Sequence, residues 1–322
     1  MQPHADRPVV SVVMPVYNGG QWLAAAVESV LAQTVSNIEV LIVDDASDDD
    51  SAHIAGQFAH RDSRVRLLRQ VTNRGQAAAR NLALDNARGI WIAPVDADDE
   101  IHPDRLRILV EAGERDHADL IADGILFHTA GQPGITAELM TWRRNGQVLE
   151  SLSAEALIRS GIAGQRRSLG FLKPLMRRSF LEESRLRYDE ELRFAEDFNL
   201  YARALFCGAR FLLFPESYYV YRQTPCSASR AAMACKGAQA LANCQHLRRA
   251  LPREASPELT ATLDEYEERW LLLTWFDQVK RGVASRHLPR LIQLMFKLPV
   301  GPARVLRFAR DRAAVKRQAF RG

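Results

Sequence analysis

Two short apolar runs in this chain each end in a cluster of aspartates, and this repeated pattern constrains the fold more than any other feature. The run Val40–Val43 leads into two aspartates at 44–45, and the run Ile90–Val95 leads into the sequence DADD at 96–99. Valine- and isoleucine-rich runs of this length are typical of strands that are buried on both faces of a parallel sheet. Ligands of such sheets bind beyond the carboxyl ends of the strands. We therefore expect both aspartate clusters to face one crevice.

Helical patterns alternate with strand patterns through the first 130 residues or so. Apolar residues recur at helical spacing in 22–31, and an alanine-rich helix is expected at 76–87. Ser47 followed by three aspartates predicts a helix with Ser47 as its N-cap, because acids in the first turn suit the helix dipole. This alternation predicts βαβ units, and so an α/β fold with a mostly parallel sheet flanked by helices. Further strands are expected at 9–14, 65–68 and 120–127.

The pattern changes after about residue 229. Before that point, a helix opened by Glu196 and Asp197 precedes two short strands expected at 211–214 and 218–221. Beyond it the pattern is helical throughout, with no comparable strand signal. We therefore divide the chain into an α/β domain at 1–229 and a basic helical extension at 230–322.

The composition is that of an ordinary globular protein, since 47 % of the 322 residues are hydrophobic and 25 % are charged. The four cysteines form no close CxxC pair, so we expect free thiols in a reducing compartment. The N-terminus lacks the pattern of a signal peptide, and no apolar run approaches the ~20 residues that span a bilayer. These features predict a cytoplasmic protein.

Basic residues are concentrated at the C-terminal end. From Arg286 onward ten lysines and arginines face one acid, Asp311, although the whole chain has a formal charge of only +4. Apolar and basic residues mixed in this way suit an anionic membrane surface, which predicts peripheral binding at the inner face of the plasma membrane. The alternative is a helical extension that packs on the α/β domain or on a second subunit. A nucleic-acid partner is not expected, because the tail has little aromatic interleaving.

The second aspartate cluster has the chemistry of a metal site. Near the end of a strand the side chains of Asp96 and Asp98 point the same way, because strand side chains alternate. Two carboxylates aimed at one point repel each other unless a cation is shared. Oxygen ligands at this spacing suit Mg²⁺ or Mn²⁺, which also bind substrate phosphates. The alternative is a solvated acidic turn.

Five motifs occur in order along the chain: VSVVMPVYN at 10–18, VDDAS at 43–47, NRG at 73–75 with ARN at 79–81, VDADD at 95–99, and ED at 196–197. Together they resemble the family 2 inverting glycosyltransferases with the GT-A fold, a Rossmann-like α/β architecture. The resemblance covers roughly residues 9 to 229.

The resemblance implies a nucleotide-sugar donor held by the first three motifs. Pro15 and Tyr17 match the positions that hold the nucleobase, with the tyrosine ring stacked on it. Asp45 matches the aspartate that accepts a hydrogen bond from the base. Asn73 and Arg80 match positions near the nucleotide and its phosphates. The alternatives are core packing for Tyr17 and a surface position for Arg80.

The fourth motif carries the implied metal site. By the resemblance, Asp96 meets the ribose side of the nucleotide, and Asp98 binds a Mg²⁺ or Mn²⁺ ion that bridges the diphosphate. Asp99 contacts the donor sugar. A further match, Tyr221-Arg222, resembles the closing motif of the family, so Arg222 either reaches the phosphates or lies on the surface.

The last motif supplies the implied general base. Adjacent helical residues point about 100° apart, so Glu196 and Asp197 cannot both be the base. The resemblance makes Asp197 the base that takes the proton of the acceptor hydroxyl, and attack from the side opposite the diphosphate then inverts the linkage. Glu196 orients the loop or contacts the acceptor. Without the other motifs, an aspartate at this position would be read as a helix cap.

Together these inferences predict a metal-dependent inverting hexosyltransferase. It would move a hexose from a nucleotide-diphosphate sugar, expected to be a UDP-sugar, to a hydroxyl of a glycan or lipid-linked oligosaccharide in exopolysaccharide biosynthesis. Two alternatives stay open: sugar transfer to a polyprenyl phosphate, and a non-catalytic nucleotide-sugar-binding protein. A nucleotidyltransferase is less favoured, because the loop after the first strand lacks a basic residue.

Overall fold

The structure is a computed structural model that describes residues 7–129, 134–135, 137–139, 150–162, 168–223, 233–285, 294 and 299–319. Within these residues the strands are β1 (Val10–Val16), β2 (Ile38–Asp44), β3 (Val65–Arg69), β4 (Trp91–Pro94), β5 (Glu100–Ile101), β6 (Leu120–Thr129), β7 (Ala137–Leu139), β8 (Glu150–Ser151), β9 (Leu175–Arg177) and β10 (Phe211–Gln223). The helices are α1 (Gly20–Leu31), α2 (Ser51–Arg61), α3 (Gln76–Asn86), α4 (Arg105–Arg115), α5 (Ala154–Ser160), α6 (Arg178–Glu183), α7 (Glu196–Phe206), α8 (Met233–Ala250), α9 (Pro257–Ala284) and α11 (Pro302–Ala319), with a short 3₁₀ helix, η1 (Leu169–Phe171).

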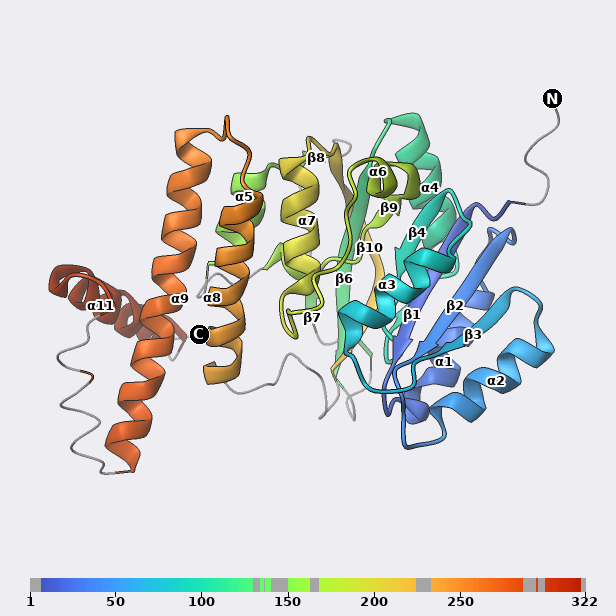
Figure 1. Cartoon of the computed structure of the whole chain (residues 1–322), viewed down its shortest axis with the longest axis horizontal. Coiled ribbons are helices and arrows are strands. Elements are labelled where there is room, and N and C mark those ends of the chain that lie inside the picture. The colour runs from blue at the N-terminus through green and yellow to red at the C-terminus, as the bar shows by residue number, and fades with distance from the viewer. Residues whose placement is uncertain are drawn as a thin grey trace.

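All ten of these strands join one sheet. Its main path runs β3-β2-β1-β4-β9-β6-β10-β5, with β7 paired to β6 and β8 to β10 (Figure 1). The longest pairings are parallel: β1 with β2, β2 with β3, β1 with β4, and β10 with β6. Antiparallel pairings are contributed by the short strands β5, β7, β8 and β9. The sheet is therefore parallel at its N-terminal end, as predicted, and mixed beyond β4.

The carboxyl ends of β1, β2 and β4 meet at one edge of the sheet. Every residue of β1 and β2 is buried, which explains their uninterrupted apolar sequence. Beyond these strands the Asp45 N–H donates to the Val16 carbonyl over 2.9 Å, and the Val95 N–H donates to the Val13 carbonyl over 3.0 Å. Both aspartate clusters therefore leave the sheet beside the end of β1.

Two local predictions differ from the structure. Ser47 is not a helix N-cap: α2 begins at Ser51 with Asp50 at the cap, and the Ser47 hydroxyl accepts a hydrogen bond from the Asn18 N–H over 3.0 Å. The two short strands expected near the end of the domain are one strand, β10, whose pairing with β6 shifts register between Leu213 and Ser217. This irregularity interrupts the alternation of side chains, so the sequence pattern resembles two strands.

The helical extension packs against the α/β domain. In Figure 1, α8 and α9 stand beside α7 and α5, on the side of α7 away from β1, β2 and β3. A buried hydrogen bond of 2.8 Å joins Asn199 of α7 to Asn243 of α8. In turn α11 packs on α9, since the buried ring of Phe308 lies 5.3 Å from that of Phe276. Among the described residues, no helix is long and apolar enough to cross a membrane.

Candidate active site

A cavity of about 580 Å³ opens at the carboxyl edge of the sheet, where the two aspartate clusters lie. Its walls come from the ends of β1, β2 and β4, from the segment before α7, and from the extension helix α9. Eight of the residues singled out from the sequence line it: Pro15, Tyr17, Asp45, Asn73, Asp96, Asp98, Glu196 and Asp197. The structure therefore brings together residues that lie up to 180 or so positions apart in the chain. Arg80, Asp99 and Arg222 do not line the cavity.

The first end of the cavity is formed by Tyr17, Asp45 and Asn73. The ring of Tyr17 is half exposed and Asn73 is exposed, so both side chains are accessible. Asp45 is buried, and its two carboxylate oxygens accept hydrogen bonds from the backbone N–H groups of Arg74 and Gly75, each over 2.7 Å. The carboxylate thus fixes the loop that carries Asn73 against the end of β2.

The centre of the site is a cluster of three carboxylates and two cations. Arg80 of α3 is completely buried and lies 2.7 Å from Asp96, 2.8 Å from Glu196 and 3.2 Å from Asp197. Lys173, which precedes β9, lies 2.9 Å from Asp96 and 2.8 Å from Asp197. Buried charges are tolerated only when they are paired, and here each cation pairs with more than one carboxylate. The cluster therefore joins the β4 end to the start of α7.

Burial would raise the pKa of Asp96, but the charges of Lys173 and Arg80 outweigh it and hold that pKa below its usual range. Burial and the adjacent Asp197 charge raise the pKa of Glu196. Oδ2 of Asp197 accepts the Lys173 hydrogen bond over 2.8 Å. Oδ1 is buried and lies 3.2 Å from Arg80, but it accepts no hydrogen bond from the described residues.

Asp98 has a different environment from Asp96. Its side chain lines the cavity, and no side chain of the described residues forms a hydrogen bond or an ion pair with it. Burial, followed by the charge of Asp96, raises the pKa of Asp98 to about 6. A cation bound beside Asp98 would favour its ionised form. The position thus fits a ligand of a divalent metal, whereas both oxygens of Asp96 already bind protein cations.

Asp99 and Arg222 contact each other rather than the cavity. The buried Asp99 carboxylate accepts hydrogen bonds from the Tyr219 hydroxyl over 2.7 Å and from the Arg222 N–H over 2.9 Å. The Arg222 guanidinium pairs with Glu100 and lies 4.8 Å from the centre of the Trp22 ring. Both residues therefore fasten β10 to the loop that carries the second aspartate cluster.

Arg193 is a cavity residue that the sequence patterns did not indicate. Its exposed side chain lies over Gly75, whose φ of +90° favours glycine, and a Cβ added at Gly75 would have to displace the end of the Arg193 side chain. No side-chain partner of Arg193 occurs within the described part of the chain. The site thus contains an accessible guanidinium beside Asn73. Lys173 was missed as well, because neither residue belongs to a recognisable motif.

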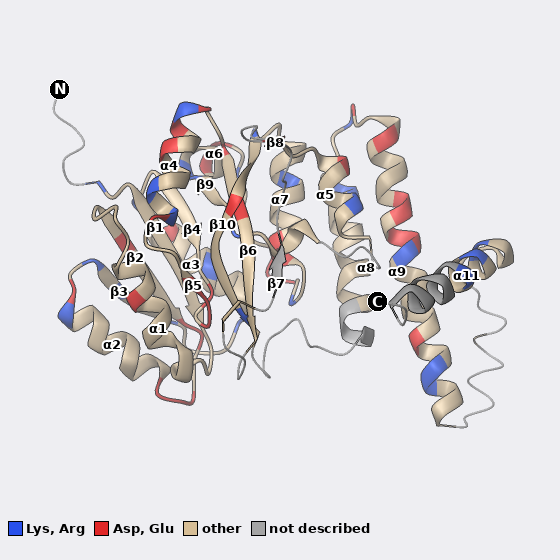
Figure 2. Cartoon of the chain, turned by 180° about the vertical axis from the view of Figure 1, so that it is seen from behind, with Lys and Arg blue, Asp and Glu red and all other residues tan. Residues whose placement is uncertain are grey.

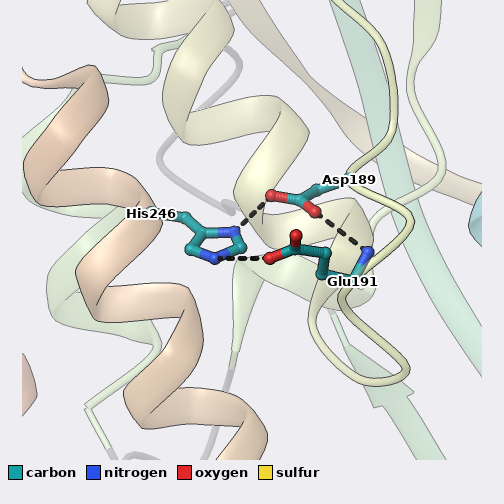
Figure 3. Close-up of side chains that lie close together, drawn as sticks. All are labelled: Asp189, Glu191 and His246. Carbon is teal, nitrogen blue, oxygen red and sulfur yellow. Dashed lines mark hydrogen bonds and ion pairs between the residues drawn. The ribbon is translucent and has the colours of Figure 1, made fainter.

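The loop between α6 and α7, residues 184–195, holds a second cluster, shown in Figure 3. Its members Asp189, Glu191 and His246 of α8 each offer one ligand atom, all within 4.8 Å of one another. However, the two carboxylates face opposite nitrogens of the imidazole ring: Nδ1 faces Asp189, whereas Nε2 faces Glu191 at 3.3 Å (Figure 3). One metal ion can bind only one ring nitrogen, so it could replace only one of these two contacts. We interpret the cluster as a hydrogen-bonded clamp between the loop and the extension.

Figure 2 shows Lys and Arg residues in blue along the described part of α11. Arg307 and Arg310 are exposed, as is the neighbouring Leu306, with 71 % of its surface accessible. Arg304 pairs with Glu268 of α9, and Arg269 of α9 lies 4.4 Å from the centre of the Phe308 ring. Within residues 302–310, one face of α11 thus packs on α9 while the other remains accessible. Most of 286–298 lies outside the described residues, and burial is described for α11 only as far as residue 310.

Comparisons with known proteins show which sequences and folds this chain is similar to. The sequence profile described as "Glycosyl transferase family 2" matches residues 11–170, which include both aspartate clusters. The succinoglycan biosynthesis protein ExoO of Rhizobium meliloti is 36 % identical over 230 residues, which cover 71 % of this chain and 65 % of that protein. The chain therefore spans less than two thirds of the length of this relative.

Two solved structures share the fold. Staphylococcus aureus TarS 1-349 in complex with UDP-GlcNAc aligns with a TM-score of 0.63 at 19 % identity, over 88 % of this chain and 79 % of that one. The mannosyltransferase PcManGT of Pyrobaculum calidifontis, in complex with GDP-Man and Mn²⁺, aligns with a TM-score of 0.59 at 18 % identity, over 90 % of this chain and 79 % of that one. The α/β fold of the GT-A type, predicted from the sequence, is confirmed.

Proposed function

Because the chain belongs to glycosyltransferase family 2, we propose that it transfers a hexose from a nucleotide-diphosphate sugar to an acceptor hydroxyl, with inversion at the anomeric carbon. One observation carries the proposal: Tyr17, Asp45, Asp98 and Asp197 line a single cavity at the carboxyl edge of the sheet. Ligands of open α/β sheets bind at this edge. We propose a UDP-sugar as the donor, in keeping with the UDP-GlcNAc held by TarS.

The nucleotide would bind where Pro15, Tyr17, Asp45 and Asn73 meet. The accessible Tyr17 ring can stack on the base, as aromatic side chains do with nucleobases. Each Asp45 oxygen retains a lone pair beyond its backbone hydrogen bond, so the carboxylate can accept one from the base. Arg193, with its accessible guanidinium, takes the phosphate contact that the sequence alone assigned to Arg80 and Arg222.

We propose that Asp98 holds the Mg²⁺ or Mn²⁺ ion, with Asp96 beside it on the ribose side. When bound, such an ion neutralises the charge that develops on the leaving diphosphate. The support is the half-buried Asp98 carboxylate, which has no side-chain partner among the described residues, and the Mn²⁺ present in the PcManGT complex. Calorimetry of UDP with and without Mn²⁺ tests this: Asp98→Asn should abolish the gain in UDP affinity that Mn²⁺ gives the unaltered protein. A gain of equal size in both proteins would remove Asp98 from the metal site.

Asp197 is the proposed base. The acceptor oxygen gives its proton to Oδ1 while it forms the bond to the anomeric carbon, and the bond from that carbon to the diphosphate oxygen breaks. The nucleoside diphosphate leaves with the bonding electrons. Arg80 and Lys173 orient the Asp197 carboxylate through their ion pairs with it. Arg80 also pairs with Glu196. Asp99, held by Tyr219 and Arg222, positions the aspartate loop and does not contact the donor sugar in this proposal.

The decisive experiment replaces the base. General-base assistance is worth roughly 10²- to 10⁴-fold in rate, so Asp197→Asn should reduce transfer by about that factor. Binding of UDP with Mn²⁺ should be retained, because Asp197 lies outside the nucleotide end. Asp85→Asn is a matched control, since the exposed Asp85 pairs only with Arg187 at the surface. Unchanged transfer in Asp197→Asn would favour an anionic polyprenyl phosphate acceptor, which needs no strong base. Absence of transfer in the unaltered protein, with UDP binding intact, would favour a non-catalytic binding protein.

The cellular setting is a proposal too. The relative ExoO takes part in succinoglycan biosynthesis, and we propose an equivalent step here, on a glycan or lipid-linked oligosaccharide at the cytoplasmic face of the membrane. The accessible face of α11, with Arg307, Arg310 and Leu306, supports binding to anionic lipid. Co-sedimentation of the full chain with anionic vesicles tests this, and the absence of binding would end the membrane proposal.

A further inference from the structure

The wall of the cavity next to Asp197 is aromatic and is built from segments beyond the family match at 11–170. Phe171 ends η1, Phe198 follows Asp197 in α7, and Tyr266 and Trp270 come from α9. The rings of Phe198 and Tyr266 stack 5.4 Å apart at 11°, and Tyr266 meets Trp270 edge-on at 6.4 Å. We call these four residues the aromatic wall; within it, ring contacts lead from Phe198, the residue after the proposed base, through Tyr266 to Trp270 of the helical extension.

The aromatic wall is shaped by two glycines. A Cβ at Gly161 would lie 2.7 Å from Phe198 Cε2 and 3.0 Å from Tyr266 Cε2, and one at Gly170 would lie 3.0 Å from Phe198 Cβ. The distance of 2.7 Å is too short for two carbon atoms in contact and the distances of 3.0 Å are tight, so a side chain at either glycine would require Phe198 to shift. Phe171 differs from the other three rings because 39 % of its surface is exposed, whereas Phe198, Tyr266 and Trp270 are buried. The aromatic wall thus consists of one accessible ring and three buried rings that line the same cavity.

The position of the wall indicates what binds to it. The acceptor hydroxyl must reach Asp197, so the group that touches Phe171 and Phe198 is the part of the acceptor that carries this hydroxyl. A pyranose ring has a face of C–H groups, which carry partial positive charge and suit the negative face of an aromatic ring. A phosphate would need an available cation here, but Arg80 and Lys173 each bind more than one carboxylate.

We propose that Phe171 and Trp270, supported by Tyr266, form the subsite for the sugar ring of the acceptor, so that the helical extension selects the acceptor. The inference rests on the proposed function and adds the chemical class of the second substrate. Donor recognition belongs to the strand ends of the α/β domain, and acceptor recognition belongs to η1 and α9. Variants in the aromatic wall should therefore weaken acceptor binding and leave donor binding unchanged.

The test measures transfer from a UDP-sugar to a panel of aryl glycosides, together with calorimetry of UDP and Mn²⁺. Phe171→Ala should raise the KM for the accepted glycoside about tenfold, which is the scale of one lost aromatic stacking contact. Phe171→Tyr should restore it, because the ring is kept. UDP affinity should not change in either variant. Because Phe171 is partly exposed, its replacement is not expected to prevent folding.

Variants in α9 provide a second measurement. Trp270→Leu should also raise the acceptor KM, whereas Trp275→Leu serves as a control on the same helix, since Trp275 is outside the cavity and its N–H donates to the Leu294 carbonyl. Equal acceptor KM values in the Phe171→Ala, Trp270→Leu and unaltered proteins would overturn the proposal. So would a loss of UDP affinity as large as the loss of acceptor affinity.

Binding without turnover separates this proposal from the proposed function. Saturation-transfer NMR with methyl glycosides and UDP needs no reaction, and contact with the glycoside should be detected in the unaltered protein and lost in Phe171→Ala. If the unaltered protein binds UDP but no glycoside, the acceptor subsite is wrong while the donor site stands. If it binds glycosides through Phe171 but not UDP, the donor assignment fails and the saccharide subsite stands.

Discussion

The two walls of the cavity are built in different ways. The donor wall consists of residues directly after β1, β2 and β4, three adjacent parallel strands whose ends are aligned by the sheet itself. The acceptor wall comes from η1, the start of α7 and α9, which no common sheet aligns. Buried ion pairs, aromatic stacking and loop contacts hold those pieces in place. In the proposed function, donor recognition thus follows from regular secondary structure, whereas acceptor recognition depends on tertiary contacts over long distances in the sequence.

The loop 184–195 connects the two walls. On the donor side Glu190 pairs with Arg74 and accepts a hydrogen bond from Asn81. On the acceptor side His246 contacts Asp189, and the Arg193 N–H donates to Gln239 of α8 over 2.6 Å. The loop is therefore fixed to α3 and to α8, and it leads directly into the helix that carries Asp197.

The largest loss of stability is expected on replacement of Arg80, the buried cation shared by the two walls. Arg80→Met would leave Asp96, Glu196 and Asp197 with only Lys173 as a buried cation, and loss of one partner from such a cluster costs about 3–5 kcal/mol in unfolding free energy. Denaturant unfolding measures this. Arg187→Met is the control, because its exposed pair with Asp85 is worth less than about 1 kcal/mol. Similar small losses in both variants would show that the walls are not coupled through Arg80.

A smaller effect, on the affinity for the nucleotide sugar, is expected on replacement of Arg193. Arg193→Gln should weaken binding of a UDP-sugar about tenfold, because a hydrogen bond to a charged group contributes about 1.5–3 kcal/mol. Stability should hardly change, since the side chain is exposed. Calorimetry of the nucleotide sugar measures the first, and denaturant unfolding the second. Unaltered affinity would place the phosphates away from Gly75 and restrict the donor wall to the strand ends.

The smallest effect is expected at the clamp between loop and extension. His246→Gln removes the contacts of the imidazole with Asp189 and Glu191 and should lower the unfolding free energy by about 1 kcal/mol, with nucleotide affinity retained. His60→Gln, on the exposed surface of α2, is the control. Thermal unfolding with added Zn²⁺ or Mn²⁺ sharpens the test. A stabilisation by metal that disappears in His246→Gln would show that the cluster of Figure 3 holds an ion instead of acting as a clamp.

The amino-acid sequence by itself determined the α/β fold and the place of the donor wall. Buried strands have continuous apolar sequences, and polar clusters that follow such strands must emerge at one sheet edge; Asp45, Asp96 and Asp98 could be found in this way. Local patterns failed where one side chain could form either of two hydrogen bonds. Ser47 is the example: its hydroxyl accepts a hydrogen bond from the Asn18 N–H instead of capping a helix.

Only the tertiary structure decided which charges are paired and what completes the site. Arg80 and Arg222 carry the right charge for phosphates. In the folded chain, however, Arg80 is paired with three carboxylates and Arg222 with Glu100. Arg193, by contrast, is left accessible. Lys173 and the aromatic wall have no periodicity that indicates a site. Their roles arise from contacts between residues 24 to 77 positions apart in the sequence. Such contacts are set by packing of the whole core, which no local pattern records.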